Sequence, residues 1–214
     1  MSSLRITEIF HSLQGESRTA GRPTTFVRLT GCPLRCQYCD TAYAFSGGTL
    51  MAVADVVERV AAFPARRVTV TGGEPLAQAT VHVLMTALAD DGYDVSLETG
   101  GAIDISAVDG RVSIVMDLKT PGSHECERNR YANIDHLAAK DQVKFVICDA
   151  ADYAWAKEQC DTWRLTERVG EVLFSPSASE MSPAVLADWI LRDGLDVRFQ
   201  VQLHKVLWGD TPGR

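Results

Sequence analysis

The feature that most constrains this chain is a group of three closely spaced cysteines, Cys32, Cys36 and Cys39, in a loop led by Gly31. Three thiolates can hold three irons of a [4Fe–4S] cubane and leave the fourth iron open to a cofactor or substrate. An enzyme needs such an open position, whereas an electron carrier does not. A structural zinc site usually has four ligands in close pairs, and the sequence contains no second pair. We therefore interpret the triplet as the ligand set of an enzymatic iron–sulfur cluster.

Two other interpretations of the cysteines stay open at this stage. The triplet could be three small buried apolar residues or an incomplete zinc site. An iron–sulfur electron carrier or a zinc-stapled binding module needs a fourth ligand, which Cys126 or a histidine has to supply. Cys148 ends the apolar run Phe145–Cys148 and is interpreted as a core residue, while Cys126 and Cys160 lie in polar surroundings and are interpreted as incidental.

Length and composition favour one domain over residues 1–214, because 214 residues with 46% apolar content suffice for a full core. A net charge of −7 argues against a nucleic-acid surface, which needs clustered Lys and Arg. No apolar stretch approaches the roughly 20 residues that a membrane span requires, and the start lacks the apolar core of a signal peptide. We expect a cytoplasmic protein that acts on a small molecule and binds neither nucleic acid nor membrane.

Short β-branched runs alternate with stretches of helical periodicity, which is typical of an α/β fold built from βαβ units around a parallel sheet. The expected strands are Thr24–Leu29, Arg67–Val70, Val95–Glu98, Val112–Leu118, Gln142–Ile147, Glu171–Phe174 and Val197–Gln202. The expected helices are Met51–Phe63, Thr80–Ala89, Asp152–Trp163 and Pro183–Leu191, with Thr49 and Ser182 as caps of the first and last.

The unusual residues follow the expected strands, where parallel α/β folds place their reactive groups. The segments are Thr30–Gly48, Thr71–Pro75, Glu98–Gly101 and Lys119–Gly122. Since the carboxyl ends of parallel strands share one edge, we expect these loops to converge on one face.

The CxxxCxxC triplet resembles the cluster motif of the radical S-adenosylmethionine (SAM) superfamily. This resemblance implies a shortened, partial parallel β/α barrel, and it places Tyr38 near the adenine of SAM. The run Gly72-Gly73-Glu74-Pro75 resembles the superfamily's motif for the amino group of SAM. The chemistry agrees, because glycines allow close backbone approach and a carboxylate accepts hydrogen bonds from an ammonium.

Further motifs look like those of the 7-carboxy-7-deazaguanine synthase family of queuosine (7-deazapurine, tRNA modification) biosynthesis. They are Glu8–Glu16, Gly21–Pro23, Phe26–Arg28, Cys39–Thr41 and Gln202–Lys205. The resemblance implies a lyase that converts 6-carboxy-5,6,7,8-tetrahydropterin into 7-carboxy-7-deazaguanine with loss of ammonia. It also implies a [4Fe–4S] cluster, SAM and Mg²⁺ as cofactors, a homodimer, and a reductant such as flavodoxin or ferredoxin.

The same resemblance implies a set of site residues. Those implied to bind SAM are Tyr38, Cys39, Asp40, Gly73, Glu74, Asp117, Lys119, Ser175 and Ser177. Those implied to bind the substrate are Leu13, Gln14, Gly15, Glu16, Arg28, Thr71 and His204. Thr41 corresponds to the magnesium ligand, and a hydroxyl oxygen suits this hard ion, with water and substrate as the remaining ligands.

Each assignment has a structural alternative. Arg28 offers a fork for a carboxylate but could be a salt-bridged strand residue, and Gln14 and Glu16 could form a solvated turn. His204, near an expected strand end, could be a satisfied structural histidine, and Asp117 with Lys119 could be a structural ion pair. A radical SAM activase that acts on a protein partner shares the cysteine triplet but needs neither Arg28 nor the Leu13–Glu16 segment.

Overall fold

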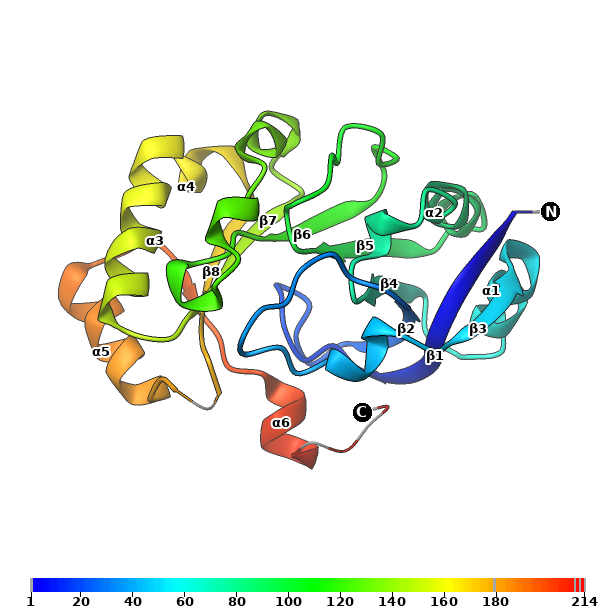
Figure 1. Cartoon of the computed structure of the whole chain (residues 1–214), viewed down its shortest axis with the longest axis horizontal. Coiled ribbons are helices and arrows are strands. Elements are labelled where there is room, and N and C mark those ends of the chain that lie inside the picture. The colour runs from blue at the N-terminus through cyan, green and yellow to red at the C-terminus, as the bar shows by residue number, and fades with distance from the viewer. Residues whose placement is uncertain (1, 179, 210, 212, 214) are drawn as a thin grey trace.

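One β-sheet organises the chain (Figure 1). The computed structural model describes residues 2–178, 180–209, 211 and 213, and within these residues the sheet has nine strands in the order β3-β1-β2-β4-β5-β6-β7-β8-β9. The strands are β1 (Ser3–Leu13), β2 (Pro23–Leu29), β3 (Thr49–Ala52), β4 (Arg67–Gly72), β5 (Asp94–Thr99), β6 (Ser113–Asp117), β7 (Gln142–Ile147), β8 (Glu171–Pro176) and β9 (Arg198–Phe199). Strand β1 pairs antiparallel with β2 and β3, and all pairs from β2–β4 to β8–β9 are parallel. The parallel part is the partial β/α barrel expected from the sequence.

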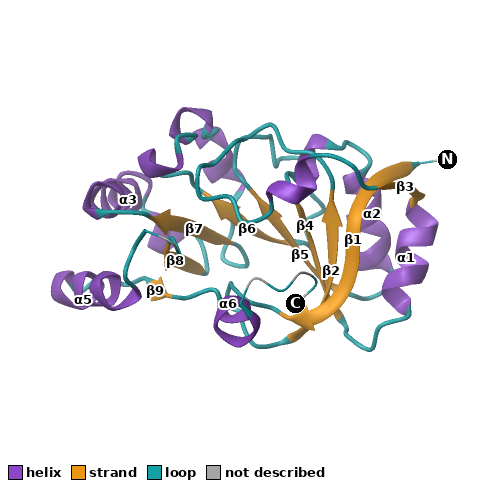
Figure 2. Cartoon of the chain, turned by 60° about the horizontal axis from the view of Figure 1, so that its bottom comes forward, coloured by secondary structure: helices purple, strands orange, loops and turns teal. Residues whose placement is uncertain are grey.

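Helices connect the strands and leave one side of the sheet open (Figure 2). The α-helices are α1 (Val53–Ala61), α2 (Val81–Asp90), α3 (Ala150–Trp163), α4 (Leu165–Arg168), α5 (Pro183–Asp193) and α6 (Leu203–Trp208). Short 3-10 helices lie in the loops: η1 (Ala42–Phe45), η2 (Pro75–Ala77), η3 (Pro121–Ser123), η4 (Cys126–Arg128) and η5 (Tyr131–His136). In Figure 2 helix α6 lies on the open side of the sheet.

Alternation of side chains along the strands divides the sheet into an apolar face and a polar face. On β4, Val68 and Val70 join the buried core, whereas Thr71 lines a pocket on the other face. On β5, Leu97 belongs to the core and Glu98 to the pocket. The helices therefore cover the apolar face, and the polar face is left for ligands.

The structure confirms the parallel strands, extends four of them by one or two residues and shortens the expected strand Val112–Leu118 to Ser113–Asp117. It also corrects three expectations. The first helix begins at Val53 rather than Met51, because Thr49 lies in the edge strand β3 and Ala52 is the N-cap. Only Arg198–Phe199 of the expected last strand pairs with β8, since the Gln200 side chain turns inward to bond the Ser17 amide at 2.9 Å. His204 lies in helix α6 and not near a strand end.

Strand β1 was not expected from the sequence, because it lacks a continuous apolar run and its residues are mostly half-buried. It forms a hairpin with β2, closed by the Gln14 amide donating to the Arg22 carbonyl at 2.9 Å.

Ser182 is the N-cap residue of α5, as predicted. No helix in the described part of the chain is long and apolar enough to cross a membrane.

Candidate active site

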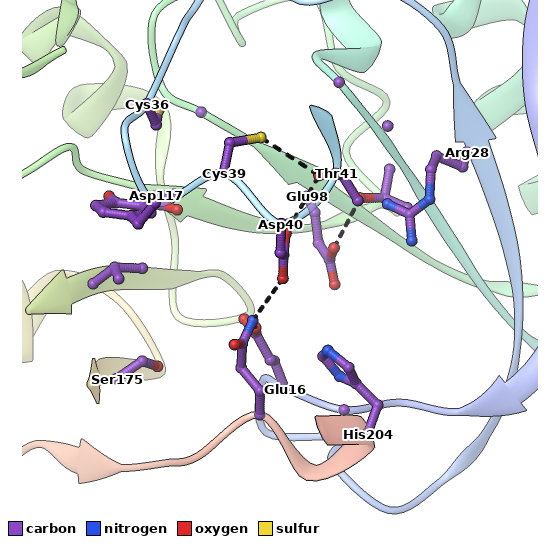
Figure 3. Close-up of a pocket in the computed structure, with 18 of the residues that line it drawn as sticks. Glu16, Arg28, Cys36, Cys39, Asp40, Thr41, Glu98, Asp117, Ser175 and His204 are labelled. Atoms are coloured by element: carbon purple, nitrogen blue, oxygen red, sulfur yellow. Dashed lines mark hydrogen bonds between the residues drawn. The ribbon is translucent and has the colours of Figure 1, made fainter. Parts of the chain in front are cut away.

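A pocket of about 640 Å³ lies on the polar face of the sheet. Its walls come from the ends of the parallel strands, from the long loop after β2, and from the C-terminal segment (Figure 3). Every residue that the sequence suggested as a cluster, SAM, magnesium or substrate ligand lines this pocket. Residues far apart in the sequence thus meet in one place, at the edge where parallel strands place reactive groups.

The loop of residues 30–48, here called the cluster loop, carries the three thiols of Cys32, Cys36 and Cys39 into the pocket. Burial raises the pKa of the Cys32 and Cys36 thiols, so binding of a metal cluster has to displace their protons. The backbone amide of Leu34 points at Cys32 Sγ at 3.4 Å and is placed to stabilise a thiolate.

The arrangement of the thiols suits a cluster better than a single ion. Among the described residues, no three His, Cys, Asp or Glu side chains lie close enough together to hold one metal ion. In a cubane each thiolate binds a different iron, so its ligands stand further apart than those of one ion. Neither Cys126 nor Cys148 lines the pocket, which leaves the triplet without a fourth cysteine there. These observations fit a cluster with one open iron.

Contacts with other loops fix the shape of the cluster loop. Gln37 donates from Nε2 to the Glu180 carboxylate at 2.7 Å and from its backbone amide to the Ser123 carbonyl at 3.2 Å. The Arg35 amide donates to Glu125 Oε1 at 2.6 Å. The loop is therefore held by the segments that follow β6 and β8.

The turn after β4 packs directly against the cluster loop. A Cβ atom on Gly73 would lie 2.3 Å from the Gly31 carbonyl oxygen, so only glycine fits there. Glu74 is completely buried and accepts hydrogen bonds from the Gly100 amide at 2.7 Å and from Thr99 Oγ1 at 2.9 Å. Burial raises the pKa of Glu74, although these donors oppose the effect. Glu74 thus joins the ends of β4 and β5 beneath the cluster loop.

Four charged side chains form a network across the pocket floor. Lys119 Nζ lies 2.8 Å from Asp117 Oδ2, and Lys144 Nζ lies 2.7 Å from Glu16 Oε2 and 3.7 Å from Asp117 Oδ2. Burial alone would raise the pKa of Asp117, but the two lysines outweigh it and hold that pKa below its usual value. Asp117 Oδ1 is buried and has no hydrogen-bond partner among the described residues, which leaves it free for a ligand. Asp117 and Lys119 therefore form an ion pair, as the sequence allowed, and both also line the pocket, so their role in binding SAM stays a prediction.

Glu98 is a pocket residue that the sequence placed at the start of a loop expected at the site but to which it gave no role. Its carboxylate accepts hydrogen bonds from Thr71 Oγ1 at 2.9 Å and from Gln14 Nε2 at 3.2 Å. Burial, and then the neighbouring Glu16, raise the pKa of Glu98. The available signal was its position at the end of a predicted strand, directly before a Thr-Gly-Gly turn.

The C-terminal segment closes one side of the pocket. A Cβ atom on Gly15 would lie 2.1 Å from His204 Nδ1, so α6 and the β1–β2 loop are in close contact. Gln202 Nε2 donates to Glu16 Oε1 at 2.8 Å and to Asp40 Oδ2 at 3.1 Å (Figure 3). Burial by itself would raise the pKa of Asp40, but the Lys205 ammonium 3.6 Å away and the Gln202 amide lower it.

The remaining predicted residues lie nearby. Thr41 Oγ1 is 3.4 Å from Asp40 Oδ1. Tyr38 Oη is buried without a partner among the described residues, and burial raises the pKa of Tyr38 far above its usual value. Ser175 accepts a hydrogen bond from Gln200 at 3.0 Å. Ser177 is buried at the end of the same strand.

Comparison with known proteins adds independent evidence. The model of the Radical SAM superfamily matches residues 26–124. A 7-carboxy-7-deazaguanine synthase from Chlorobaculum tepidum is 44% identical over 209 residues, which cover 96% of this chain and 94% of that protein. The corresponding synthase from Koribacter versatilis is 41% identical and covers 96% of this chain and 97% of its own length.

Solved structures show the same fold. The crystal structure of QueE from Escherichia coli superposes with a TM-score of 0.77 and covers 94% of this chain and 95% of its own, at 20% identity. SuiB from Streptococcus suis bound to S-adenosylmethionine superposes with a TM-score of 0.55, covering 80% of this chain and 45% of its own, at 13% identity. At these identities the two structures support the fold only.

Proposed function

The chain belongs to the 7-carboxy-7-deazaguanine synthase family of radical SAM enzymes, and from this premise we propose how its pocket carries out the reaction. The reaction is the conversion of 6-carboxy-5,6,7,8-tetrahydropterin into 7-carboxy-7-deazaguanine with loss of ammonia. The observation that carries the proposal is that all site residues suggested by the sequence line one pocket. We also propose that residues 1–214 form one domain that carries this site.

The half of the pocket nearest the cysteines would hold the cluster and SAM. Cys32, Cys36 and Cys39 would be the ligands of the [4Fe–4S] cluster, which together with SAM would supply the radical that starts the reaction. Asp117, with its free buried oxygen, suits the hydroxyl groups of a ribose, and the Tyr38 ring suits an adenine face. The other assigned residues would surround the rest of SAM. They are Gly73, Glu74, Asp40, Lys119, Ser175 and Ser177.

The pterin occupies the other half, between Arg28 and the C-terminal segment. Arg28 pairs with the substrate carboxylate as a bidentate fork. Gln14, Glu16 and Glu98 supply the amide and carboxylate groups that match the donors and acceptors of the pyrimidine edge. Thr71 and His204, with the backbone of Leu13 and Gly15, complete this half.

Thr41 would hold magnesium only together with substrate, because one hydroxyl cannot make a magnesium site. Water and the substrate carboxylate would supply the remaining oxygens. Packing of α6 against the β1–β2 loop excludes water from the reacting pterin, which protects a radical intermediate from side reactions. We also propose that the enzyme is a cytoplasmic homodimer that takes electrons from flavodoxin or ferredoxin.

Anaerobic turnover tests the function directly. The cluster is reconstituted, and dithionite, SAM, magnesium and the carboxylated pterin are added, with products followed by mass spectrometry. Appearance of 7-carboxy-7-deazaguanine is the expected result. Formation of 5′-deoxyadenosine without that product would leave a radical SAM enzyme with a different substrate, such as a protein partner.

Two substitutions test the assigned residues. Arg28→Ala should lower kcat/KM about 100-fold, since a bidentate charged hydrogen bond contributes roughly 3 kcal/mol. Arg198→Ala removes an arginine from the far edge strand β9 and serves as the control, with turnover expected near the wild-type rate. Thr41→Ala should weaken the dependence of turnover on magnesium. If this dependence is unchanged in the variant, Thr41 is not a magnesium ligand.

A further inference from the structure

We propose that Glu8 and Tyr43 are positioning residues that aim the free edge of the Arg28 guanidinium at the substrate carboxylate. The proposal rests on the function above and adds two residues to which that function gives no role. Selection of a carboxylated pterin therefore depends on Glu8 and Tyr43 as well as on Arg28, which contacts the carboxylate.

The β1–β2 hairpin sets the first contact. Glu8 and Arg28 are partners in the antiparallel register, so their side chains lie on the same face of the sheet. Arg28 Nε donates to Glu8 Oε1 at 2.7 Å, and the two side chains are only 15% and 22% exposed. This contact occupies the Nε side of the guanidinium. The two terminal nitrogens have no hydrogen-bond partner among the described residues and can form a fork to a ligand.

Aromatic rings fix the plane of the guanidinium. Arg28 Cζ lies 5.9 Å from the centroid of the Phe10 ring and 5.9 Å from that of the Tyr43 ring. Phe10 is itself stacked on Phe26, with ring centroids 4.9 Å apart, so this wall is rigid. An arginine between two rings and one carboxylate has little freedom to rotate, and such preorganisation lowers the entropy lost on binding.

Tyr43 ties this arrangement to the cluster loop. Its hydroxyl donates to the same Glu8 oxygen at 2.8 Å, and it lies in η1, two residues after Thr41. In Figure 3 Arg28 and Cys36 lie on opposite sides of the pocket. The contact between Tyr43 and Glu8 therefore fixes the arginine relative to the loop that carries the proposed magnesium ligand.

Two opposite effects decide what loss of Glu8 does to binding of a carboxylate. Removal of the Glu8 charge leaves Arg28 less neutralised, which favours a ligand anion, but for a partly exposed pair this gain is small. Removal of the Glu8 oxygens also frees the arginine to rotate, and ordering it again weakens binding about two- to tenfold. We expect the loss of positioning to exceed the gain in charge.

The test measures binding rather than turnover. The dissociation constants of 6-carboxy-tetrahydropterin and of tetrahydropterin without the carboxylate are measured by calorimetry on the cluster-loaded, SAM-bound enzyme with no reductant. Glu8→Ala should weaken binding of the carboxylated pterin about tenfold, which equals about 1.4 kcal/mol. Binding of the pterin without a carboxylate should change less than about twofold, because it makes no contact with the fork.

Conservative variants separate positioning from charge. Glu8→Gln keeps an oxygen that accepts from Arg28 Nε, so most of the affinity should return, within about threefold of wild type. Tyr43→Phe keeps the ring and removes only the hydroxyl, and should weaken binding of the carboxylated ligand about threefold. Glu171→Ala breaks a comparable glutamate–arginine pair, with Arg198, at the opposite edge of the sheet and should change neither constant.

The outcomes distinguish this inference from the proposed function. A wild-type enzyme that binds both pterins equally contradicts the proposed function, and the positioning role with it. A wild-type preference for the carboxylate that persists in Glu8→Ala overturns the positioning role alone. Tighter binding of the carboxylated pterin by Glu8→Ala, or equal losses for both ligands, also overturns it.

Discussion

Replacement of Lys144 by methionine should destabilise the protein strongly, because this ammonium pairs with two carboxylates on the pocket floor. It lies 2.7 Å from Glu16 Oε2 and 3.7 Å from Asp117 Oδ2, and its side chain is only 17% exposed. Methionine has a similar length and shape without the charge, so the change leaves two carboxylates without this cation and opens little new space.

The size of the effect follows from distance and burial. At an effective dielectric constant of 20, two unit charges 2.7 Å apart attract by about 6 kcal/mol, which is an upper limit. Breaking a buried pair by removing one partner typically costs about 3–5 kcal/mol. Asp117 retains Lys119 at 2.8 Å and Glu16 retains the Gln202 amide, so we expect about 3 kcal/mol. For a chain of this size that corresponds to a fall in Tm of about 6–12 °C.

Anaerobic thermal unfolding of the cluster-loaded protein at pH 8 and pH 5.5 provides the assay. The loss of Tm should be smaller at pH 5.5. Burial raises the pKa of nearby Glu98, and a carboxyl whose folded-state pKa is raised contributes stability at low pH that is lost as the pH rises. Without Lys144 the pKa of Glu98 rises further. The Tm of the variant therefore approaches that of wild type as the pH falls.

Two further variants make the test specific. The double substitution Glu16→Gln with Lys144→Met should recover at least about 1 kcal/mol, because it no longer leaves Glu16 charged and without its ammonium partner. Lys140→Met is the control, since its partner Asp141 keeps the Ile114 amide as a donor at 2.8 Å. A loss of Tm smaller than about 2 °C in Lys144→Met refutes the reasoning, and so does an equal loss of Tm at both pH values.

Three further predictions concern the pocket walls. Gly73→Ala should abolish cluster incorporation, measured by iron content and visible absorbance, because its Cβ would lie 2.3 Å from the Gly31 carbonyl oxygen and push the cluster loop away; full iron content would contradict this contact. Gly15→Ala should raise KM for the pterin several-fold at nearly constant iron content, since a Cβ 2.1 Å from His204 Nδ1 displaces that side chain; an unchanged KM removes His204 from the substrate half. Cys126→Ser should retain wild-type iron content, since Cys126 does not line the pocket. A loss of iron would indicate that Cys126 is a fourth protein ligand.

Much of the fold was predictable because buried parallel strands are short and apolar. The run Gln142–Ile147 is a strand with the predicted bounds, since its side chains pack in the core and the local pattern agrees with the tertiary structure. The antiparallel edge was not predictable, because β1 is half-buried and its pattern depends on pairing with β2. The last expected strand was too long for a related reason: the Gln200 amide still donates to the Phe174 carbonyl of β8 at 3.1 Å, but the Gln200 side chain makes tertiary hydrogen bonds that no local pattern encodes.

The candidate site divides in the same way. Residues within motifs, such as Glu74 and Arg28, were predictable because their spacing carries the signal. Glu98 and Lys144 lack a motif, and each looks like an ordinary polar residue on a strand until the sheet brings it beside Gln14 or Glu16. Partners that act through another residue are harder still, because the contact between Glu8 and Arg28 depends on the register of a strand that the sequence did not reveal.

Lys144 also explains why the two halves of the pocket cannot be treated as independent sites. Its ammonium contacts Glu16, proposed to face the pterin, and Asp117, proposed to face SAM. A ligand that draws either carboxylate away from Lys144 changes the charge balance at the other, and such coupling acts equally in both directions. Gln202 makes a similar connection, because one amide donates to both Glu16 and Asp40. The substrate half, the cluster loop and Gln202 at the start of α6 therefore share one polar network.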